Sequence, residues 1–367
     1  MENGNNKKVL VGMSGGVDSA AAALLLREAG YEPVGCTLRL YDNEDIGEPV
    51  EGTCCSLEAV EDARETCRRL GLDHYVFNFS EAFRRCVMDD FVEGYRSGRT
   101  PNPCIACNRH IKFDALLRRA DELDISYIAT GHYARVDYDA VLGRWRLLRG
   151  EDRKKDQSYV LYPLSQKVLS RLLLPVGDYD KPAVRRIAAS AGFRNANKPD
   201  SQDICFVPDG DYAGFLRRYG EVELVPGDFI DEAGHVLGRH KGLPCYTTGQ
   251  RRGLGVSADR PLYVLGKDEA RNAVILGEES KLYRRVVWAE NFNWVSLPPV
   301  TGPMAVTAKT RYSQTEAPGV LYPEADGGVR VEFEEPQRAV TCGQSLVCYH
   351  AEEREIVIGG GVICGAE

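Results

Sequence analysis

The chain contains a turn of small residues, S-G-G-V-D-S at positions 14–19, with the composition of a phosphate-binding loop. It follows an apolar run at residues 8–13 and opens a helical pattern at 18–29, which Gly30 closes in the usual position past a helix end. Because the residues of the turn lack bulk, backbone N–H groups can approach an anion there, and the helix start adds the positive end of its dipole. The turn lacks the lysine of a Walker A loop, G-x-x-x-x-G-K-[ST]. It therefore predicts a phosphate site of another kind.

Three cysteines lie in surroundings that favour thiol chemistry. Cys104 and Cys107 form a C-x-x-C pair where a helix is expected to begin, after the run T-P-N-P at residues 100–103, whose prolines favour an extended loop. A helix start and nearby basic residues favour the reactive thiolate. Cys205 lies in the polar segment D-S-Q-D-I-C-F at 200–206. The C-x-x-C pair could be half of a zinc site, a redox pair, a sulfur-transfer pair carrying a persulfide, or incidental.

The remaining cysteines carry weaker signals. Cys67 recurs with apolar residues at helical spacing and is expected in a core. We expect a structural role for seven cysteines: Cys36, Cys67, Cys86, Cys245, Cys342, Cys348 and Cys364. The adjacent Cys54 and Cys55 follow the second predicted strand, and a redox or accessory role stays open for them.

Size and composition are those of a globular protein with two or three domains: 367 residues, 43% hydrophobic and 27% charged. The apolar run at 20–26 is far shorter than the ~20 residues of a membrane span, and no secretion signal precedes it. We expect a cytoplasmic protein without a membrane partner. The formal net charge of −8 argues against indiscriminate nucleic-acid binding. One basic cluster is expected to be a solvated surface or a local nucleic-acid contact: Arg144, Arg146, Arg149, Arg153, Lys154 and Lys155.

The elements that must position these groups follow an α/β pattern at first. Strands are predicted at 8–13, 33–40, 74–79 and 126–130, and helices at 18–29, 56–70, 80–97 and 111–123, which indicates a parallel sheet covered on both faces. Ligands bind at the carboxyl ends of such strands. The expected domains are an α/β domain at 1–212, a small mixed domain at 213–282 and an all-β barrel at 283–367, the last from alternating segments at 286–288, 305–310, 329–333, 345–349 and 355–362.

The turn at 14–19 resembles the pyrophosphate loop of the PP-loop ATP pyrophosphatases. It is followed in order by T-P-N-P-x-x-x-C-N-x-x-I-K-F, A-T-G-H-Y-A (129–134), K-D-Q-S-Y (155–159), D-S-Q-D-I-C-F and G-Q-R-x-G-L-G (249–255). Together these motifs resemble the MnmA/TrmU family of tRNA 2-thiouridylases over nearly the whole chain. The resemblance implies ATP-dependent 2-thiolation of the wobble uridine of specific tRNAs, through an adenylated uridine and sulfur from a cysteine persulfide.

The resemblance also implies roles for individual residues. Asp18 would hold Mg²⁺ on pyrophosphate, Cys107 would be the nucleophile and Cys205 would bear the persulfide, with sulfur supplied by a cysteine desulfurase relay or by sulfide. The ATP-binding residues would be Gly12, Met13, Ser14, Gly15, Gly16, Val17, Asp18, Ser19, Leu38 and Gly131. Asn102 and Pro103 would meet the target base, and the tRNA contacts would be His132, Lys155, Asp156, Gln157, Arg311, Tyr312 and Gln344.

One departure from the family pattern concerns Cys104, because many members have aspartate there and this chain cannot do carboxylate chemistry at that position. Cys104, Cys107 and Cys205 could instead ligate a [4Fe–4S] cluster with one open iron for sulfide. Two other functions keep the same turn or the same β domain: an amidating ligase with an amine nucleophile, and a metal-containing RNA-binding module without catalysis. In the thiolation hypothesis, adenylation and sulfur delivery must share one cavity.

Overall fold

The computed structural model describes residues 7–46, 57–199 and 204–367. Its N-terminal part is a parallel sheet in the order β3-β2-β1-β4-β7. The strands are β1 (Lys8–Gly12), β2 (Glu32–Arg39), β3 (His74–Asn78), β4 (Tyr127–Ala129) and β7 (Leu172–Leu173). The central strand β1 reads as an unbroken apolar run because helices cover both of its faces, and Val9, Leu10 and Val11 have no exposed surface.

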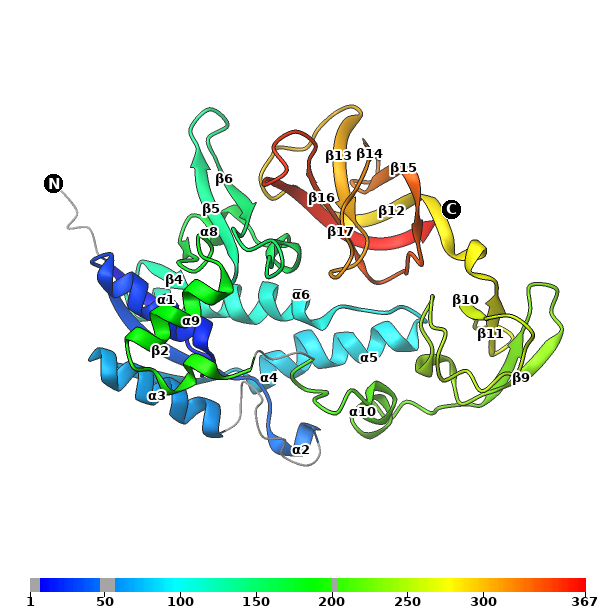
Figure 1. Ribbon diagram of the computed structural model, residues 1–367, viewed down its shortest axis with the longest axis horizontal. Coiled ribbons are helices and arrows are strands. Elements are labelled where there is room, and N and C mark those ends of the chain that lie inside the picture. The colour runs from blue at the N-terminus through cyan, green and yellow to red at the C-terminus, as the bar shows by residue number, and fades with distance from the viewer. Residues whose placement is uncertain (1–6, 47–56, 200–203) are drawn as a thin grey trace.

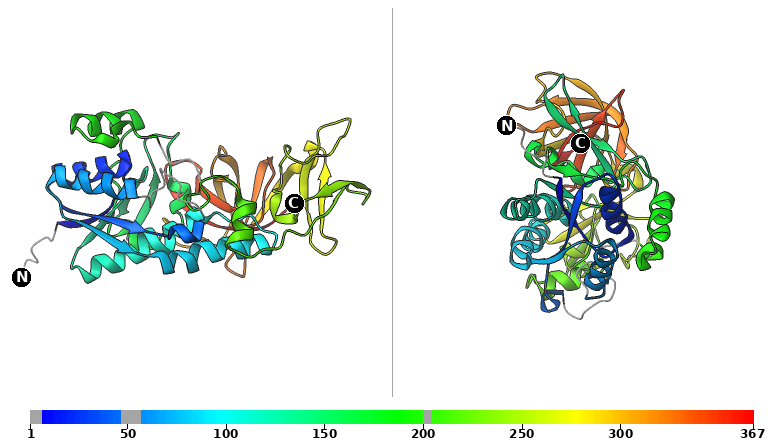
Figure 2. Two further views of the ribbon diagram at one scale, coloured as in Figure 1. Left: turned by 90° about the horizontal axis from the view of Figure 1, so that it is seen from below. Right: turned by 90° about the vertical axis from the view of Figure 1, so that its left-hand side faces the viewer.

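Alternate residues of β1 face different helical layers, seen edge-on in the right-hand view of Figure 2. Val9 and Val11 pack with the alanines of the first helix, while Leu10 packs on the opposite side against Leu116 and Leu117. The first layer is α1 (Val17–Glu28), α3 (Leu57–Leu70) and α9 (Lys181–Ser190); the second contains α6 (Pro103–Cys107), η2 (Asn108–Ala115) and α7 (Leu116–Glu122). Shorter helices are α2 (Asn43–Ile46), α8 (Gln166–Leu169) and α10 (Tyr212–Arg218), with 3₁₀ turns η3 (Ser158–Leu161), η4 (Arg194–Asn197), η5 (Leu243–Cys245) and η6 (Glu279–Leu282).

The predicted helix at 111–123 begins earlier in the structure, at Pro103. The Asn102 side chain accepts a hydrogen bond from the Cys104 backbone N–H at 3.2 Å and caps the helix, so that the Cys104–Cys107 pair lies within its first turns. The predicted helix at 80–97 is present as α4 (Ser80–Phe83), a π-helical turn η1 (Arg84–Met88) and α5 (Asp89–Arg96). Strand β7 was not predicted, because two residues are too few to show a period.

Two further sheets complete the fold. A four-stranded mixed sheet has the order β10-β11-β8-β9, and a closed antiparallel barrel has the order β12-β15-β14-β13-β16-β17. The strands of the mixed sheet are β8 (Gly227–Ile230), β9 (Val236–His240), β10 (Tyr263–Asp268) and β11 (Ala273–Gly277). Those of the barrel are β12 (Tyr283–Asn293), β13 (Met304–Lys309), β14 (Ala317–Pro323), β15 (Val329–Arg338), β16 (Ser345–His350) and β17 (Val357–Ala366). The predicted all-β barrel is confirmed.

Strand β14 escaped prediction because it opens A-P-G, which reads as a turn. Gly319 is required there for close approach, since a Cβ at this position would lie 2.6 Å from the carbonyl oxygen of Glu332 on β15. The barrel lies over α5 and α6, and the mixed sheet lies at the far end of the long axis from β1 (Figure 1).

The barrel and the α/β part share a hydrophobic core. Val347, Tyr349 and Val357 of the barrel belong to the same buried cluster as Tyr159 and Tyr162. Polar contacts accompany this packing: the hydroxyl of Tyr159 donates to the Ser345 carbonyl at 2.8 Å, and the Asn293 amide donates to the Tyr162 carbonyl at 2.6 Å.

The basic cluster at 144–155 is neither a solvated face nor a free phosphate contact for most of its length. It lies on and after a hairpin, β5 (Ala134–Asp139) and β6 (Arg144–Arg149), that the sequence analysis did not predict. Arg146 pairs with Asp137 at 2.6 Å. Arg149 is buried, pairs with Glu316 of the barrel at 2.7 Å and lies 3.7 Å from the ring centre of Tyr349. Arg146 thus pairs within the hairpin, and Arg149 joins the hairpin to the barrel.

Within the described residues, the helices are all too short or too polar to span a bilayer.

Replacing Tyr159 by alanine should open the shared core. We expect Tyr159→Ala to lower the free energy of unfolding by about 3–5 kcal/mol, the usual cost of removing a buried aromatic ring. Tyr159→Phe keeps the ring, loses only the hydrogen bond to Ser345 and should cost about 1 kcal/mol. Urea denaturation followed by tryptophan fluorescence measures both. Equal midpoints for Tyr159→Ala and Tyr159→Phe would show that the barrel is not anchored by this ring.

Candidate active site

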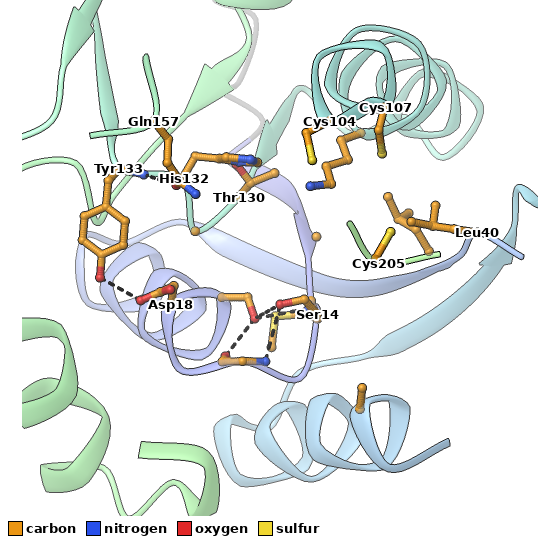
Figure 3. Close-up of a pocket in the computed structure, with 18 of the residues that line it drawn as sticks. Ser14, Asp18, Leu40, Cys104, Cys107, Thr130, His132, Tyr133, Gln157 and Cys205 are labelled. Carbon is orange, nitrogen blue, oxygen red and sulfur yellow. Dashed lines mark hydrogen bonds between the residues drawn. The ribbon is translucent and has the colours of Figure 1, made fainter. Parts of the chain in front are cut away.

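A cavity of about 460 Å³ opens at the carboxyl ends of β1, β2 and β4, a volume typical of small-molecule sites. The turn at 13–19 lines it on one side, and Cys104, Cys107 and Cys205 line it on another (Figure 3). The glycine turn and the three cysteines therefore lie in one cavity, as the thiolation hypothesis requires. Leu38, Leu40 and Phe83 add apolar surface, which suits a purine ring.

The phosphate turn is held by close backbone approaches that exclude side chains. Gly15 has φ +74°, and a Cβ there would lie 2.4 Å from the carbonyl oxygen of Ala59. A Cβ at Gly131, after β4, would lie 2.6 Å from the Asp18 carbonyl carbon and 2.7 Å from the Ser19 nitrogen. Glycine at both positions is thus a steric requirement, and Gly131 contributes by letting its loop touch the first turn of α1.

The two serines of the turn are linked to each other. The Ser14 backbone N–H donates to Ser19 Oγ at 3.2 Å, and Ser19 Oγ donates to the Gly16 carbonyl at 3.0 Å. The Gly16 N–H points toward Ser14 Oγ at 3.4 Å. These contacts order the backbone of the turn before a phosphate arrives.

Asp18 forms a partly buried ion pair that the sequence analysis did not predict. Both of its carboxylate oxygens accept hydrogen bonds from Lys181 Nζ at 2.8 Å, and the Tyr133 hydroxyl donates to Oδ1 at 2.7 Å (Figure 3 shows the tyrosine contact). Lys181 is the first residue of α9 and Tyr133 follows β4, so the carboxylate connects three separate segments.

The cavity is positive although the chain is acidic. Among the described residues that line it, the lysines are Lys112, Lys155, Lys181 and Lys198, whereas Asp18 is the one carboxylate. Lys198 also pairs with Asp62 at 2.7 Å. A surplus of ammonium groups favours anionic ligands such as nucleotide phosphates.

The cysteines reach the cavity from two directions. Cys104 and Cys107 point into it from the helix α6, and Cys205 faces them beside Leu40 (Figure 3). Cys107 is only 6% exposed, Cys205 is half-buried and Cys104 is exposed. No disulfide joins cysteines within the part of the chain that the structure describes.

Cys205 is anchored by its neighbours. Its carbonyl accepts a hydrogen bond from the Tyr41 hydroxyl at 2.7 Å. The next residue, Phe206, is fully buried and makes edge-to-face contacts with Phe83 and Phe91, at ring-centre distances of 5.7 and 5.4 Å. The aromatic cluster thus fixes the chain on the C-terminal side of Cys205, whereas residues 200–203 on its other side lie outside the described part.

Three family models match consecutive parts of the chain: a tRNA methyl transferase HUP domain at 7–209, a tRNA methyl transferase PRC-barrel domain at 213–278 and an aminomethyltransferase beta-barrel domain at 284–363. Curated relatives named tRNA-specific 2-thiouridylase MnmA match over nearly full length. The protein of Moorella thermoacetica is 50% identical over 96% of this chain and 98% of its own. The protein of Clostridioides difficile is 45% identical over 98% of both chains.

This chain belongs to the MnmA family. Among solved structures, it is similar to an NMN synthetase from Francisella tularensis (TM-score 0.34, 15% identity, 61% of this chain and 81% of that one) and to a 4-thiouridine synthetase in complex with RNA and ATP (TM-score 0.34, 18% identity, 58% and 50%). At these scores neither likeness supports a statement about fold or function.

The barrel residues predicted from the MnmA resemblance to contact tRNA are engaged within the chain. Gln344 donates to the Thr100 carbonyl at 2.7 Å and so holds the loop that leads to Asn102 and Pro103. Arg311 donates to the Thr248 carbonyl at 3.0 Å and to Thr341 Oγ1 at 2.7 Å. Tyr312 is 43% exposed and lines the cavity, although it belongs to the C-terminal part of the chain.

The predicted tRNA contacts in the α/β part also fall into two groups. Some are hydrogen-bonded within the chain, and others line the cavity. The Asp156 carboxylate is buried and accepts hydrogen bonds from the Gly150 and Ser158 backbones, at 3.2 and 3.1 Å. Gln157 accepts from the Tyr133 backbone at 2.9 Å. Lys155 and His132 line the cavity, and burial, with a smaller effect of the Lys112 charge, lowers the pKa of His132 to about 3. Of this group, Lys155 is the charged side chain placed to meet a ligand.

The sequence analysis raised two metal groups, Mg²⁺ from the MnmA resemblance and an iron–sulfur cluster from the three cysteines, and they differ in how well they fit. Asp18 offers the carboxylate that Mg²⁺ needs beside ATP phosphates. An iron–sulfur cluster fits by donor type only: within residues 7–46, 57–199 and 204–367, no three His, Cys, Asp or Glu side chains gather as a metal-binding group, and the three cavity thiols are no exception. We derive no step through a cluster.

The other cysteine predictions have mixed outcomes. Cys36, Cys67 and Cys348 are completely buried, and burial raises the pKa of each thiol. Cys342 and Cys364 are exposed, so core packing does not explain them. Cys54 and Cys55 lie outside the described residues.

A methyl group at Gly131 should push the phosphate turn apart. We expect Gly131→Ala to lower the free energy of unfolding by about 1–3 kcal/mol, because its Cβ would overlap backbone atoms of Asp18 and Ser19, and to weaken ATP binding. Gly12→Ala is the matched control for stability, since its Cβ would meet only ordinary contacts, the nearest at 3.6 Å. Thermal unfolding with and without ATP measures both effects; equal melting temperatures would contradict the steric argument.

The His132 imidazole should make the fold acid-sensitive. Its pKa is lowered from 6.5 to about 3 in the folded chain, so the unfolded chain binds the extra proton and the free energy of unfolding falls as the pH drops below 6.5. Between pH 7 and pH 5 the wild type should lose up to about 2 kcal/mol more than His132→Gln. Urea unfolding of both proteins at the two pH values gives the difference, and parallel pH dependence would disprove it.

Proposed function

We propose that this chain replaces the C2 oxygen of the wobble uridine of specific tRNAs by sulfur, in two steps that consume ATP. The support that carries the proposal is the shared cavity, in which an anion-binding turn and three cysteines meet. Full-length MnmA relatives at 45–50% identity agree with it. The family models are described by methyl transfer, but a methyl transferase has no need for a turn suited to pyrophosphate.

The first step activates the uridine. The C2 oxygen attacks the α-phosphate of ATP, the bond from this phosphate to pyrophosphate breaks, and the adenylated base remains. The N–H groups of the turn at 14–19 stabilise the negative charge that grows on the leaving phosphates. Gly12, Met13, Val17 and Leu38 complete the nucleotide pocket. Mg²⁺ held by Asp18 would neutralise part of the pyrophosphate charge.

The second step delivers sulfur. The terminal sulfur of a persulfide on Cys205 attacks C2 and AMP departs. The Cys107 thiolate then attacks Cys205 Sγ, which breaks the sulfur–sulfur bond, leaves one sulfur on the base and forms a Cys107–Cys205 disulfide. Alternatively, Cys107 releases hydrosulfide first and this attacks C2. Either route needs Cys107 and Cys205 in one cavity with the nucleotide. The disulfide must then be opened before the next turnover. Sulfide can attack Cys205 Sγ, which forms the Cys205 persulfide and releases the Cys107 thiolate. Alternatively, an external dithiol reduces the disulfide, and a persulfide-carrying protein then transfers its outer sulfur to the Cys205 thiolate.

The three expected domains divide this work. Residues 1–212 would bind ATP and carry both cysteines, residues 213–282 would connect the two larger parts, and residues 283–367 would contact tRNA. The target base must leave its stack to reach the cavity, where Asn102 and Pro103 precede the cysteines. Lys155 and Tyr312 are the predicted tRNA contacts that line the cavity; Gln344 and Arg311 act on the same loop and barrel from within.

A measurement of pyrophosphate release, with and without tRNA, distinguishes the competing functions. A thiouridylase releases pyrophosphate only when tRNA is present, whereas an amidating ligase depends on an amine and a non-catalytic RNA-binding module releases none. Mass spectrometry of tRNA nucleosides then distinguishes sulfur replacement from methylation. Methylated uridine, or pyrophosphate release indifferent to tRNA, would contradict the proposal.

Cys205 should be required for the second step of the reaction and not for the first. We expect Cys205→Ser to abolish thiolation while tRNA-dependent pyrophosphate release persists, because the variant keeps the phosphate turn and loses only the sulfur carrier. Cys245→Ser is the matched control, since this cysteine lies in the central part of the chain and outside the cavity. Loss of both partial reactions in Cys205→Ser would refute the assignment of its role.

A further inference from the structure

The phosphate turn lacks a cation of its own, although the leaving group of the proposed reaction concentrates negative charge. Residues 13–19 include no lysine or arginine. Backbone N–H groups supply partial charges only, and a departing pyrophosphate needs fuller neutralisation than they provide. A Walker A loop meets this need with a lysine in its own sequence. In this fold the lysine must come from elsewhere in the chain.

Lys181 reaches the turn from α9. The residue is fixed at its backbone, where its N–H donates to Asp152 Oδ2 at 3.0 Å, and the helix behind it is capped by Asp180, which accepts from the Ala183 N–H at 2.7 Å. Its side chain is only 9% exposed and lines the cavity. Val184 and Ala188 pack with the alanines of α1, so the two helices keep a fixed relation.

We propose that Lys181 is the phosphate-binding lysine of this site, which exchanges the Asp18 carboxylate for the β- and γ-phosphates of ATP. The inference rests on the proposed use of ATP. Asp18 belongs to the turn itself and holds Lys181 Nζ at 2.8 Å from both oxygens. When the carboxylate turns to a magnesium ion on the phosphates, the ammonium group gains an anionic partner within the same cavity.

Energetics favour such an exchange over a purely structural pair. An ion pair in which Lys181 is buried and Asp18 is partly buried adds little to stability, because desolvation of the charges offsets their attraction. When Asp18 turns to a magnesium ion and Lys181 turns to the phosphates, each charged group has a new partner of opposite charge and none is left uncompensated. The Tyr133 hydroxyl holds Asp18 Oδ1 at 2.7 Å, and its ring centre lies 5.6 Å from Lys181 Nζ, so one aromatic side chain supports both members.

The other lysines of the cavity are less suited to this task. Lys198 pairs at 2.7 Å with Asp62, a residue of α3 that lies outside the turn. Lys112 lies on the helix that carries the cysteines. Lys155 lies in the segment that the family resemblance assigns to tRNA. Lys181, by contrast, contacts the turn directly through Asp18.

Nucleotide binding without tRNA tests the inference. We expect Lys181→Met to weaken ATP about tenfold to a hundredfold, the usual effect of losing hydrogen bonds to a charged group, and to leave AMP close to its wild-type affinity, since AMP has no β- or γ-phosphate. Lys181→Arg keeps the charge and should recover most of the ATP affinity. Arg186→Met is the control, because Arg186 is exposed on the same helix and outside the cavity.

Isothermal titration calorimetry with Mg²⁺–ATP and with AMP separates the outcomes. Equal weakening of both nucleotides would reduce Lys181 to a structural partner of Asp18, and unchanged ATP affinity would overturn the inference outright. If Lys181→Met does not fold, the double variant Asp18→Asn with Lys181→Met removes both charges and allows the same comparison against Asp18→Asn alone. Because no tRNA or cysteine enters the assay, a chain that binds ATP through Lys181 and still fails to thiolate would contradict only the proposed function.

Discussion

Burial of two tyrosines between the barrel and the parallel sheet is the constraint on which the site depends. Tyr159 and Tyr162 follow the hairpin and pack against Tyr349 and Val347 of the barrel. This packing brings the turn after β15 onto the loop before α6, where Gln344 holds Thr100. The cysteine helix therefore starts from a loop that is fixed by a part of the chain more than two hundred residues away. The shared core adds to the packing of Cys107 with Phe83 and Ile111, and together these contacts fix the cysteine helix opposite the phosphate turn.

The lysines and arginines of this structure have different roles. The chain carries a net charge of −8, yet four lysines and a single carboxylate line the described part of the cavity. Most arginines of the hairpin are used between domains: Arg149 is buried between Glu316 and the ring of Tyr349. Guanidinium groups, with their planar donors, suit such fixed contacts, and the more mobile ammonium groups of lysine suit a cavity where partners change.

Local patterns predicted the parts of this structure that local physics decides. The apolar run of β1, the small-residue turn and the α1 helix were all expected within one or two residues, because burial, steric access and capping act over short distances. Lys181 was missed because 163 residues separate it from Asp18 and nothing in its own segment indicates a phosphate. The β5–β6 hairpin was missed because its charged residues hide the period of two, and β14 because Pro318 and Gly319 imitate a turn. The roles of the individual tRNA-contacting residues stay predictions.

The contact between Gln344 and the Thr100 carbonyl limits how the molecule can be recombined. In a chimaera that joins the first two thirds of this chain to the barrel of a relative, Thr100 and the residue at position 344 come from different proteins. Gly343, where a side chain would collide with Thr100 at 2.8 Å, makes the fit on the barrel side equally exacting. Because the Thr100 atoms in both contacts belong to the backbone, an exchanged barrel keeps the contacts as long as it supplies glycine at position 343 and glutamine at position 344.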